Sequence, residues 1–152
     1  ARLNQVLAGL MMLAALAYVV YVIEPERVDT AQREYLPVMV AEFIATERPP
    51  GPMFNSYNWG GYLLWALPDY PVYVDGRTDL YRDAFLTRYL RAALGHDGWR
   101  ETLDEDGVNL VVVEPNSGLA RALRDEPGWT QIYPTDDYPD ENAVIYQREI
   151  QP

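Results

Sequence analysis

The sequence predicts an α/β protein: one amino-terminal transmembrane helix, then a small, mainly parallel α/β sandwich with an antiparallel hairpin at one edge. Three observations predict this class. Residues 6–23 form an 18-residue run without a charged side chain. In the remaining chain, short runs of β-forming residues alternate with helical patterns, which is typical of a largely parallel sheet covered by helices. The last two β-forming runs are separated by an acidic loop alone, which indicates a hairpin.

Composition excludes several classes of function. With 152 residues, of which 49% are apolar, the chain is long enough to form a core of its own. It has no cysteine and, because all 12 basic residues are arginine, no lysine. Disulfides, thiolate metal sites, Walker-type phosphate loops and Schiff-base cofactors are therefore excluded. The 23 acidic residues give a net charge of −11, which opposes nucleic-acid binding. We expect no cofactor, no metal and no nucleic-acid partner.

The apolar run near the amino terminus matches the thickness of a bilayer. Residues 3–23 would extend about 30 Å as a helix, which is the width of the hydrocarbon layer. A signal peptide and a buried core helix are the alternatives. The segment 15–17 resembles a cleavage site, but the apolar region of a signal peptide usually has only about 7 to 15 residues, and this run continues to Ile23. The length therefore favours a spanning helix in contact with membrane lipid.

The charges that flank this run predict its orientation. Arg2 precedes the run, whereas Glu24 and Glu26 follow it, and basic residues favour the cytoplasmic side. We therefore expect a single-pass protein of a bacterial cytoplasmic membrane, with its amino terminus inside and its acidic domain in the periplasm or outside the cell. The expected divisions are an anchor at residues 1–24, a juxtamembrane helix and linker at 25–52, and the α/β domain at 53–152.

A helix and a short strand are expected after the anchor. Asp29 and Gln32 have the spacing of a capping box, and apolar residues with helical spacing follow, which predicts a helix over residues 29–46. Pro37 lies inside this pattern and should kink or divide the helix. A proline-rich segment then ends it, and residues 53–55 have the pattern of a strand.

The middle of the chain predicts a helix, a strand and a second helix. Residues 59–67 contain two glycines that open a helix, and prolines follow it. Residues 72–74 are all β-formers and end at an Asp-Gly turn. Asp79 can then cap a helix over residues 80–94.

Helices and strands alternate again in the last third of the chain. A short helix at residues 99–103 precedes the run 108–113, the best candidate for a central strand because apolar residues occupy both of its faces. A helix at 118–124 follows. The strands expected at 130–133 and 143–147 should pair antiparallel at one edge of the sheet.

Four large aromatic side chains lie close together after the first strand: Tyr57, Trp59, Tyr62 and Trp65. They are candidates for an interface with other integral membrane subunits, because Trp and Tyr combine a large apolar ring with a polar tip. The alternative is that they are core aromatics beside a tight turn. In a helix that begins at Trp59, Tyr62 is three residues on and Trp65 six, so the rings spread over more than one face.

A second candidate site follows the strand expected at residues 72–74. Asp75, Arg77 and Asp79 lie at its carboxyl end, where α/β sheets place ligands. The same residues can instead form ion pairs and caps that hold the loop in place. Their types and spacing favour this structural role.

The remaining candidate residues are two acidic clusters, one histidine and two serines. The acidic clusters are Asp97, Glu101, Asp104, Glu105 and Asp106, and Asp136, Asp137, Asp140 and Glu141. They either face water or dock a basic extracytoplasmic protein. His96 is the one histidine, and the two serines, Ser56 and Ser117, lie outside any Gly-x-Ser-x-Gly motif. We therefore expect no catalytic residue.

The aromatic segment and the loop after it resemble a known family. Two runs carry the likeness: FNSYNWGGYLLW at residues 54–65 and VYVDGRTDLY at residues 72–81. They resemble the extracytoplasmic carboxy-terminal domain of bacterial polytopic C-type glycosyltransferase-like membrane proteins and, more distantly, the oligosaccharyltransferase catalytic subunit. The Trp-Trp-Asp-Tyr-Gly signature of that subunit would fall on residues 57–61, with Trp59 at its acidic position. The resemblance implies a domain beside a multi-span enzyme, whose catalytic carboxylates and lipid-carrier site lie elsewhere.

Two functions from different classes follow. The first is a non-catalytic, single-span subunit whose extracytoplasmic domain assembles or stabilises a larger membrane complex, with respiratory and photosynthetic complexes among the candidate hosts. The second is the periplasmic acceptor-recognition domain of a polytopic C-type glycosyltransferase, in which case the chain is the end of a longer enzyme. The sequence has no recognisable nucleophile, metal set or nucleotide loop, which favours the first.

Overall fold

The structure is a computed structural model that describes residues 2–149, without the side chains of residues 2, 29–31 and 34. The side chain of Arg2, on which the expected orientation depends, therefore lies outside the described residues. The chain divides into two compact units, Ala1–Tyr35 and Leu36–Pro152. The expected α/β class is confirmed at the level of one amino-terminal apolar helix and a small four-stranded sheet with helices.

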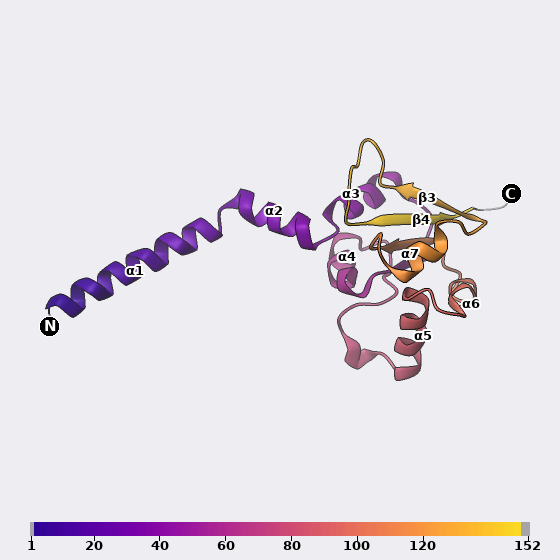
Figure 1. Ribbon diagram of the computed structural model, residues 1–152, viewed down its shortest axis with the longest axis horizontal. Helices are drawn as coiled ribbons and strands as arrows, with labels where there is room; N and C mark the ends of the chain where they lie inside the picture. Colours follow the sequence, from indigo (N-terminus) through magenta and orange to yellow (C-terminus); the bar gives the residue numbers. More distant parts are fainter. Residues whose placement is uncertain (1, 150–152) are drawn as a thin grey trace. The chain divides into compact units, whose positions relative to one another are not determined.

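The first unit contains the apolar helix α1 (Arg2–Val22), drawn in indigo in Figure 1, and α2 (Pro25–Tyr35). The window Leu3–Val22 has a mean hydropathy of 2.0, and none of it is buried. The helix is compatible with a single-pass membrane protein or with a signal sequence.

The helix expected over residues 29–46 is two helices. The first, α2, begins at Pro25, so Asp29 lies inside a helix and does not cap one. This expectation was wrong because proline is well tolerated at the first position of a helix, which starts the helix one turn earlier. The expected division at Pro37 is confirmed, since α3 (Val38–Glu47) begins directly after it.

Four strands form one mixed sheet in the order β1-β2-β4-β3, of which β3 and β4 are labelled in Figure 1. The strands are β1 (Met53–Asn55), β2 (Leu110–Val113), β3 (Trp129–Tyr133) and β4 (Val144–Arg148). The hairpin of β3 and β4 is confirmed, but the mainly parallel sheet is not: β1 and β2 are parallel, whereas β2 and β4, and β4 and β3, are antiparallel. The reason is that β4 returns between β2 and β3, so the hairpin makes an antiparallel contact with the centre of the sheet as well.

Helices pack against both faces of this sheet. They are α3 together with α4 (Gly60–Ala66), α5 (Asp83–Ala93), α6 (Trp99–Glu105) and α7 (Gly118–Leu123), with the 3-10 turns η1 (Tyr57–Trp59) and η2 (Thr78–Leu80). Successive strand residues point to opposite faces. Phe54 and Val111 belong to one hydrophobic cluster with residues of α5, α6 and α7. Met53 and Val112 belong to a second cluster with residues of α3 and α4.

The segment expected as a strand at residues 72–74 is not a strand of the sheet, because a side chain takes the place of strand pairing. Asn55 is fully buried at the end of β1. Its Oδ1 accepts hydrogen bonds from the backbone N–H of Tyr73 at 2.8 Å and of Val74 at 3.4 Å. Its Nδ2 donates to the Val74 carbonyl at 2.8 Å. One amide therefore satisfies the backbone groups that a neighbouring strand would otherwise bond.

The helix expected over residues 80–94 begins later than its predicted cap. Asp79 is exposed and lies in η2, and α5 begins at Asp83. The residue before α5, Arg82, makes no side-chain capping bond. Residues 78–80 form a 3-10 turn and therefore cannot also belong to α5, so Asp79 does not cap that helix.

Candidate functional site

The carboxyl ends of β1 and β2 form a crevice of the kind that binds ligands in α/β proteins. After β1 the chain enters η1 and α4, whose buried Trp59 and Leu63 join the cluster that contains α3. After β2 it enters α7, whose buried Leu119 and Leu123 join the cluster on the other face. Where two neighbouring parallel strands send their connections to opposite faces, a crevice opens beyond their carboxyl ends.

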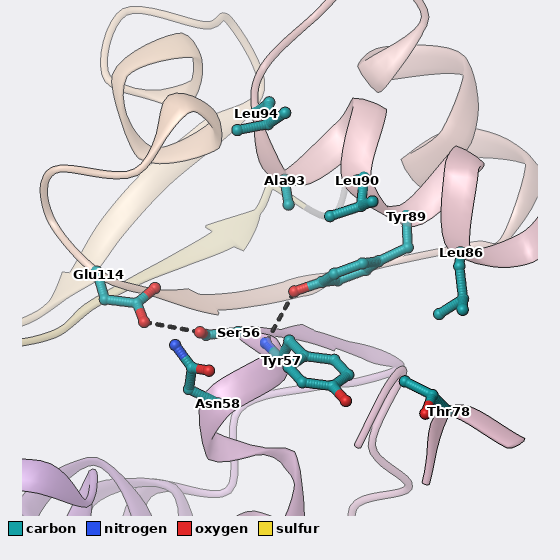
Figure 2. Close-up of a pocket in the computed structure, with 10 residues that line it drawn as sticks. All are labelled: Ser56, Tyr57, Asn58, Thr78, Leu86, Tyr89, Leu90, Ala93, Leu94 and Glu114. Carbon is teal, nitrogen blue, oxygen red and sulfur yellow. Dashed lines mark hydrogen bonds between the residues drawn. The ribbon is translucent and has the colours of Figure 1, made fainter. Parts of the chain in front are cut away.

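A pocket of about 390 Å³ lies at this position. Figure 2 shows that its polar side comes from the segments after the two strands, with Ser56, Asn58 and Glu114. Its opposite side comes from α5, with Leu90 and Leu94 among its apolar side chains. Such a pocket, mostly apolar with a few polar groups, has the character of small-molecule or peptide sites.

A hydrogen bond joins the two strand ends inside the pocket. Ser56 is the residue after β1, Glu114 is the residue after β2, and Ser56 Oγ donates to Glu114 Oε1 at 2.7 Å. Parallel pairing of β1 and β2 brings these residues together, although 58 positions separate them. Among the described residues, the Glu114 carboxylate makes no other hydrogen bond, so its second oxygen can accept one from a ligand.

Tyr89 of α5 connects the helix to the end of β1. Its hydroxyl accepts a hydrogen bond from the Tyr57 backbone N–H at 2.8 Å and is 3.3 Å from the Asn55 carbonyl, to which it donates. Its ring stacks on Phe54 with 5.2 Å between centroids. Burial raises the pKa of Tyr89 to about 12, so the phenol keeps its proton at neutral pH. Tyr89 thus forms a fixed wall of the pocket.

The charge and the residue types of the pocket indicate binding. Glu114 is the only charged residue among those that line it. A carboxylate without a neighbouring cation repels anions and favours ligands that carry hydrogen-bond donors and an apolar part. His96, the one histidine, is exposed and is not among the lining residues, so the Ser56–Glu114 pair lacks the imidazole of a catalytic triad.

The four predicted aromatic residues do not form one site. Trp59 is buried in the core with 7% of its surface exposed, whereas Trp65 is 78% exposed. Tyr57 is half-buried and lines the pocket. Tyr62 is half-buried as well, and its ring lies 5.9 Å from that of Trp65. The structure therefore assigns Trp59 to the core and Trp65 to the surface, while Tyr57 lines the pocket and Tyr62 packs against the edge of the core.

The predicted loop site contains an ion pair. Asp75 is only 2% exposed, and its Oδ1 accepts hydrogen bonds from the backbone N–H of Arg77 at 2.9 Å and from Arg77 Nε at 3.1 Å. These hydrogen bonds from Arg77 hold the pKa of Asp75 below its usual value, against the effect of burial. The hydroxyl of Tyr81 accepts from the Asp75 N–H at 3.2 Å. Asp79 is exposed, and among the described residues no hydrogen bond or ion pair joins it to Asp75 or Arg77.

The acidic clusters are partly paired within the domain. Asp104 forms an ion pair with Arg148 at 2.8 Å, and Asp106 forms one with Arg88 at 3.2 Å. Asp140 accepts a hydrogen bond of 2.6 Å from the hydroxyl of a buried tyrosine of β3. Within residues 2–149, no group of three or more His, Asp or Glu side chains has the arrangement of a metal site.

Sequence reasoning missed the contribution of Glu114 and of the apolar side of α5 to this pocket. A signal for Glu114 was present, because it directly follows the apolar run of β2, just as Ser56 follows β1. Polar residues at these two positions meet whenever the strands are parallel neighbours. The sequence pattern does not show that β1 and β2 pair with each other, because the two residues of this contact are 58 positions apart.

Comparisons with known proteins give no indication of function, so the functional argument depends on the geometry of the site. The likeness to C-type glycosyltransferase-like proteins remains a prediction that depends on residues 54–65 and 72–81 alone. No protein-family model, no curated protein and no solved structure matches the chain.

Proposed function

We propose that the chain is a non-catalytic, membrane-anchored subunit whose extracytoplasmic α/β domain assembles or stabilises a larger membrane protein complex. The observation that carries this proposal is α1. Its window Leu3–Val22 is strongly apolar, with a mean hydropathy of 2.0, and none of it is buried, so its surface needs a cover of lipid or of other membrane helices. The unit that begins at Leu36 has its own hydrophobic clusters and does not need α1 as part of its core.

The chemistry of the folded unit supports a role in binding. The Ser56–Glu114 pocket offers a hydrogen-bond acceptor beside an apolar wall, without the histidine that would activate a serine. The exposed Trp65 offers a large ring, and Trp is among the residues that contribute most to protein interfaces. Both features suit a module that binds a partner.

The test is to isolate the protein from its native membranes. Membranes are washed with carbonate and extracted in mild detergent, and everything that remains bound to the tagged chain is identified by mass spectrometry. We expect the full chain to stay with the washed membranes and to co-purify with integral membrane proteins. A chain that is released by carbonate, or that is retained but isolated alone, would contradict the proposal.

A second candidate function is acceptor recognition within a polytopic C-type glycosyltransferase. One observation favours it: residues 56–58 and Thr78, which line the pocket, belong to the two runs that carry the resemblance. A Glu114→Gln variant tests whether the pocket binds the substrate that receives the sugar. It removes the negative charge but keeps an oxygen that accepts the hydrogen bond from Ser56, so weaker substrate binding by this variant would support the function. The natural reading frame separates the two functions. Many further hydrophobic spans upstream of Ala1 would favour the enzyme.

A further inference from the structure

The outer face of α4 is apolar and exposed. Trp65 and Leu64 are 78% and 43% exposed, while Trp59 and Leu63 on the opposite side are buried in the core. Trp65 lies six residues after Trp59, which is about 240° around a helix, so a ring on this side cannot reach the core that Trp59 fills. The structure thus fixes α4 from one side and presents Trp65 outward.

The segment that contains α4 carries no charged residue in an otherwise acidic domain, and Arg48 and Asp69 line a pocket with Ala66 and Leu67 at its end. Residues 49–68 contain no charged side chain, whereas residues 24–152 carry 11 basic and 23 acidic residues, a net charge of −12. No atom lies within 4 Å of the position of a Cβ at Gly61, so the backbone next to this face is open as well. A face without charged side chains of its own can approach a lipid surface without the cost of desolvating a charge.

The size and residue types of the face fit a lipid interface better than a protein partner. A Trp and a Leu together cover about 250 Å², well below the ~800 Å² that each partner of a stable protein interface usually buries. Trp is also the residue type that concentrates at the level of the lipid headgroups, where its ring is apolar and its N–H remains hydrated.

The link between α1 and the folded unit is short. Residues 23–35 connect α1 to the folded unit, and 11 of them form α2, which is about 16 Å long. A short tether raises the effective concentration of the domain at the bilayer, so a weak insertion by one side chain suffices to hold it there. This step rests on the proposed function, since it requires α1 to be in the membrane.

We propose that the outer face of α4 docks on the membrane that α1 spans, with Trp65 inserted into the lipid interface. The domain then lies against the bilayer, with α1 and Trp65 as two separate attachments. Docking through α4 restricts the orientations that the domain can take and thus the side it presents to partner subunits.

The test uses tryptophan emission, because all four tryptophans of the chain lie between residues 59 and 129 and none lies in α1. The full chain is reconstituted in phosphatidylcholine vesicles with and without acyl chains brominated near the headgroups. Bromine should lower the emission of the parent protein by up to about a quarter, the share of one tryptophan in four. Trp65→Phe should abolish this loss. Trp129→Phe, at a half-buried position of β3, should keep the loss, which becomes up to about a third of the emission because three of the four tryptophans remain.

A further variant separates failure of the docking from failure of the anchor. Leu13→Trp in the Trp65→Phe background places a tryptophan in the middle of α1, where bromine near the ends of the acyl chains, at the centre of the bilayer, should quench it. Quenching of this probe without any quenching of Trp65 would overturn the docking and leave the anchor in place. Absence of quenching at both positions would overturn the anchor and the docking together.

Discussion

Two adjacent glycines at the start of α4 provide a matched pair of substitutions. A Cβ at Gly60 would lie 2.0 Å from the carbonyl oxygen of Val74 and 2.7 Å from the Cα of Asp75. Both contacts are with backbone atoms, and Asn55 and Arg77 hold this backbone in place through hydrogen bonds. Gly60 is therefore required for the close approach of α4 to the segment that follows residue 71.

The expected cost of Gly60→Ala follows from this clash. Contacts under 3.0 Å essentially never occur at a Cβ, so the backbone must move by about 1 Å, and overpacking of this kind costs about 1 to 3 kcal/mol or more. Gly61→Ala meets no atom within 4 Å and should gain up to about 1 kcal/mol from helix propensity. The two variants should differ by about 3 kcal/mol, or about 10 °C in melting temperature for a domain of this size.

Urea unfolding followed by tryptophan emission measures this difference. All four tryptophans belong to the folded unit, so the full chain in detergent micelles can be used and α1 does not contribute to the signal. The slope of the transition should be the same for both variants, because each unfolds the same domain. Equal stability of Gly60→Ala and Gly61→Ala would refute the requirement for close packing at Gly60.

Four further predictions concern the core, the loop, the anchor and the orientation of the domain. Asn55→Ala should lower the free energy of unfolding by about 2 to 4 kcal/mol, because it leaves buried backbone groups such as those of Val74 unpaired. A decrease under about 1 kcal/mol in urea unfolding would show that water replaces the amide. Arg77→Ala should lower the melting temperature at pH 7, since Asp75 stays buried without its partner. Arg77 holds the pKa of Asp75 below its unfolded value, so this stabilisation is present above about pH 4 and is lost as the pH falls through the lowered pKa. The melting temperatures of the parent and the variant should therefore converge in acid. A difference that stays constant with pH would contradict the ion pair. Deletion of residues 1–23 should give a folded, water-soluble domain, which should stay in the supernatant when washed membranes are sedimented. Protease added to intact spheroplasts should digest the domain of the full chain. Full protection from the protease would reverse the expected orientation.

Local patterns in the sequence were sufficient for most of the elements. The apolar length of α1, the helix break at Pro37 and the apolar run of β2 each depend on neighbouring residues alone. The hairpin of β3 and β4 was predictable as well, since short connections favour antiparallel neighbours. These are the features for which periodicity and turn residues carry the structural information.

The arrangement of the sheet was not predictable from such patterns. Insertion of β4 beside β2 depends on a pairing between residues more than 30 positions apart, Val113 with Val144 being the nearest in sequence. The segment at residues 72–74 has the composition of a strand, yet the buried amide of Asn55 satisfies its backbone instead. Both outcomes depend on long-range contacts, and local propensity contains no information on these.

The aromatic segment contains one ring that belongs to the core and one that lies outside it, to which we assign the proposed attachment. Trp59 and Leu63 lie four residues apart on the inner side of the helix that η1 and α4 form, and they fix this helix to the sheet. Trp65 points away from this core and is free of any role in it. A core that needs only the inner positions leaves the outer position available to a membrane or a partner. Substitutions at Trp59 should therefore affect stability, and substitutions at Trp65 should affect attachment while the domain stays folded.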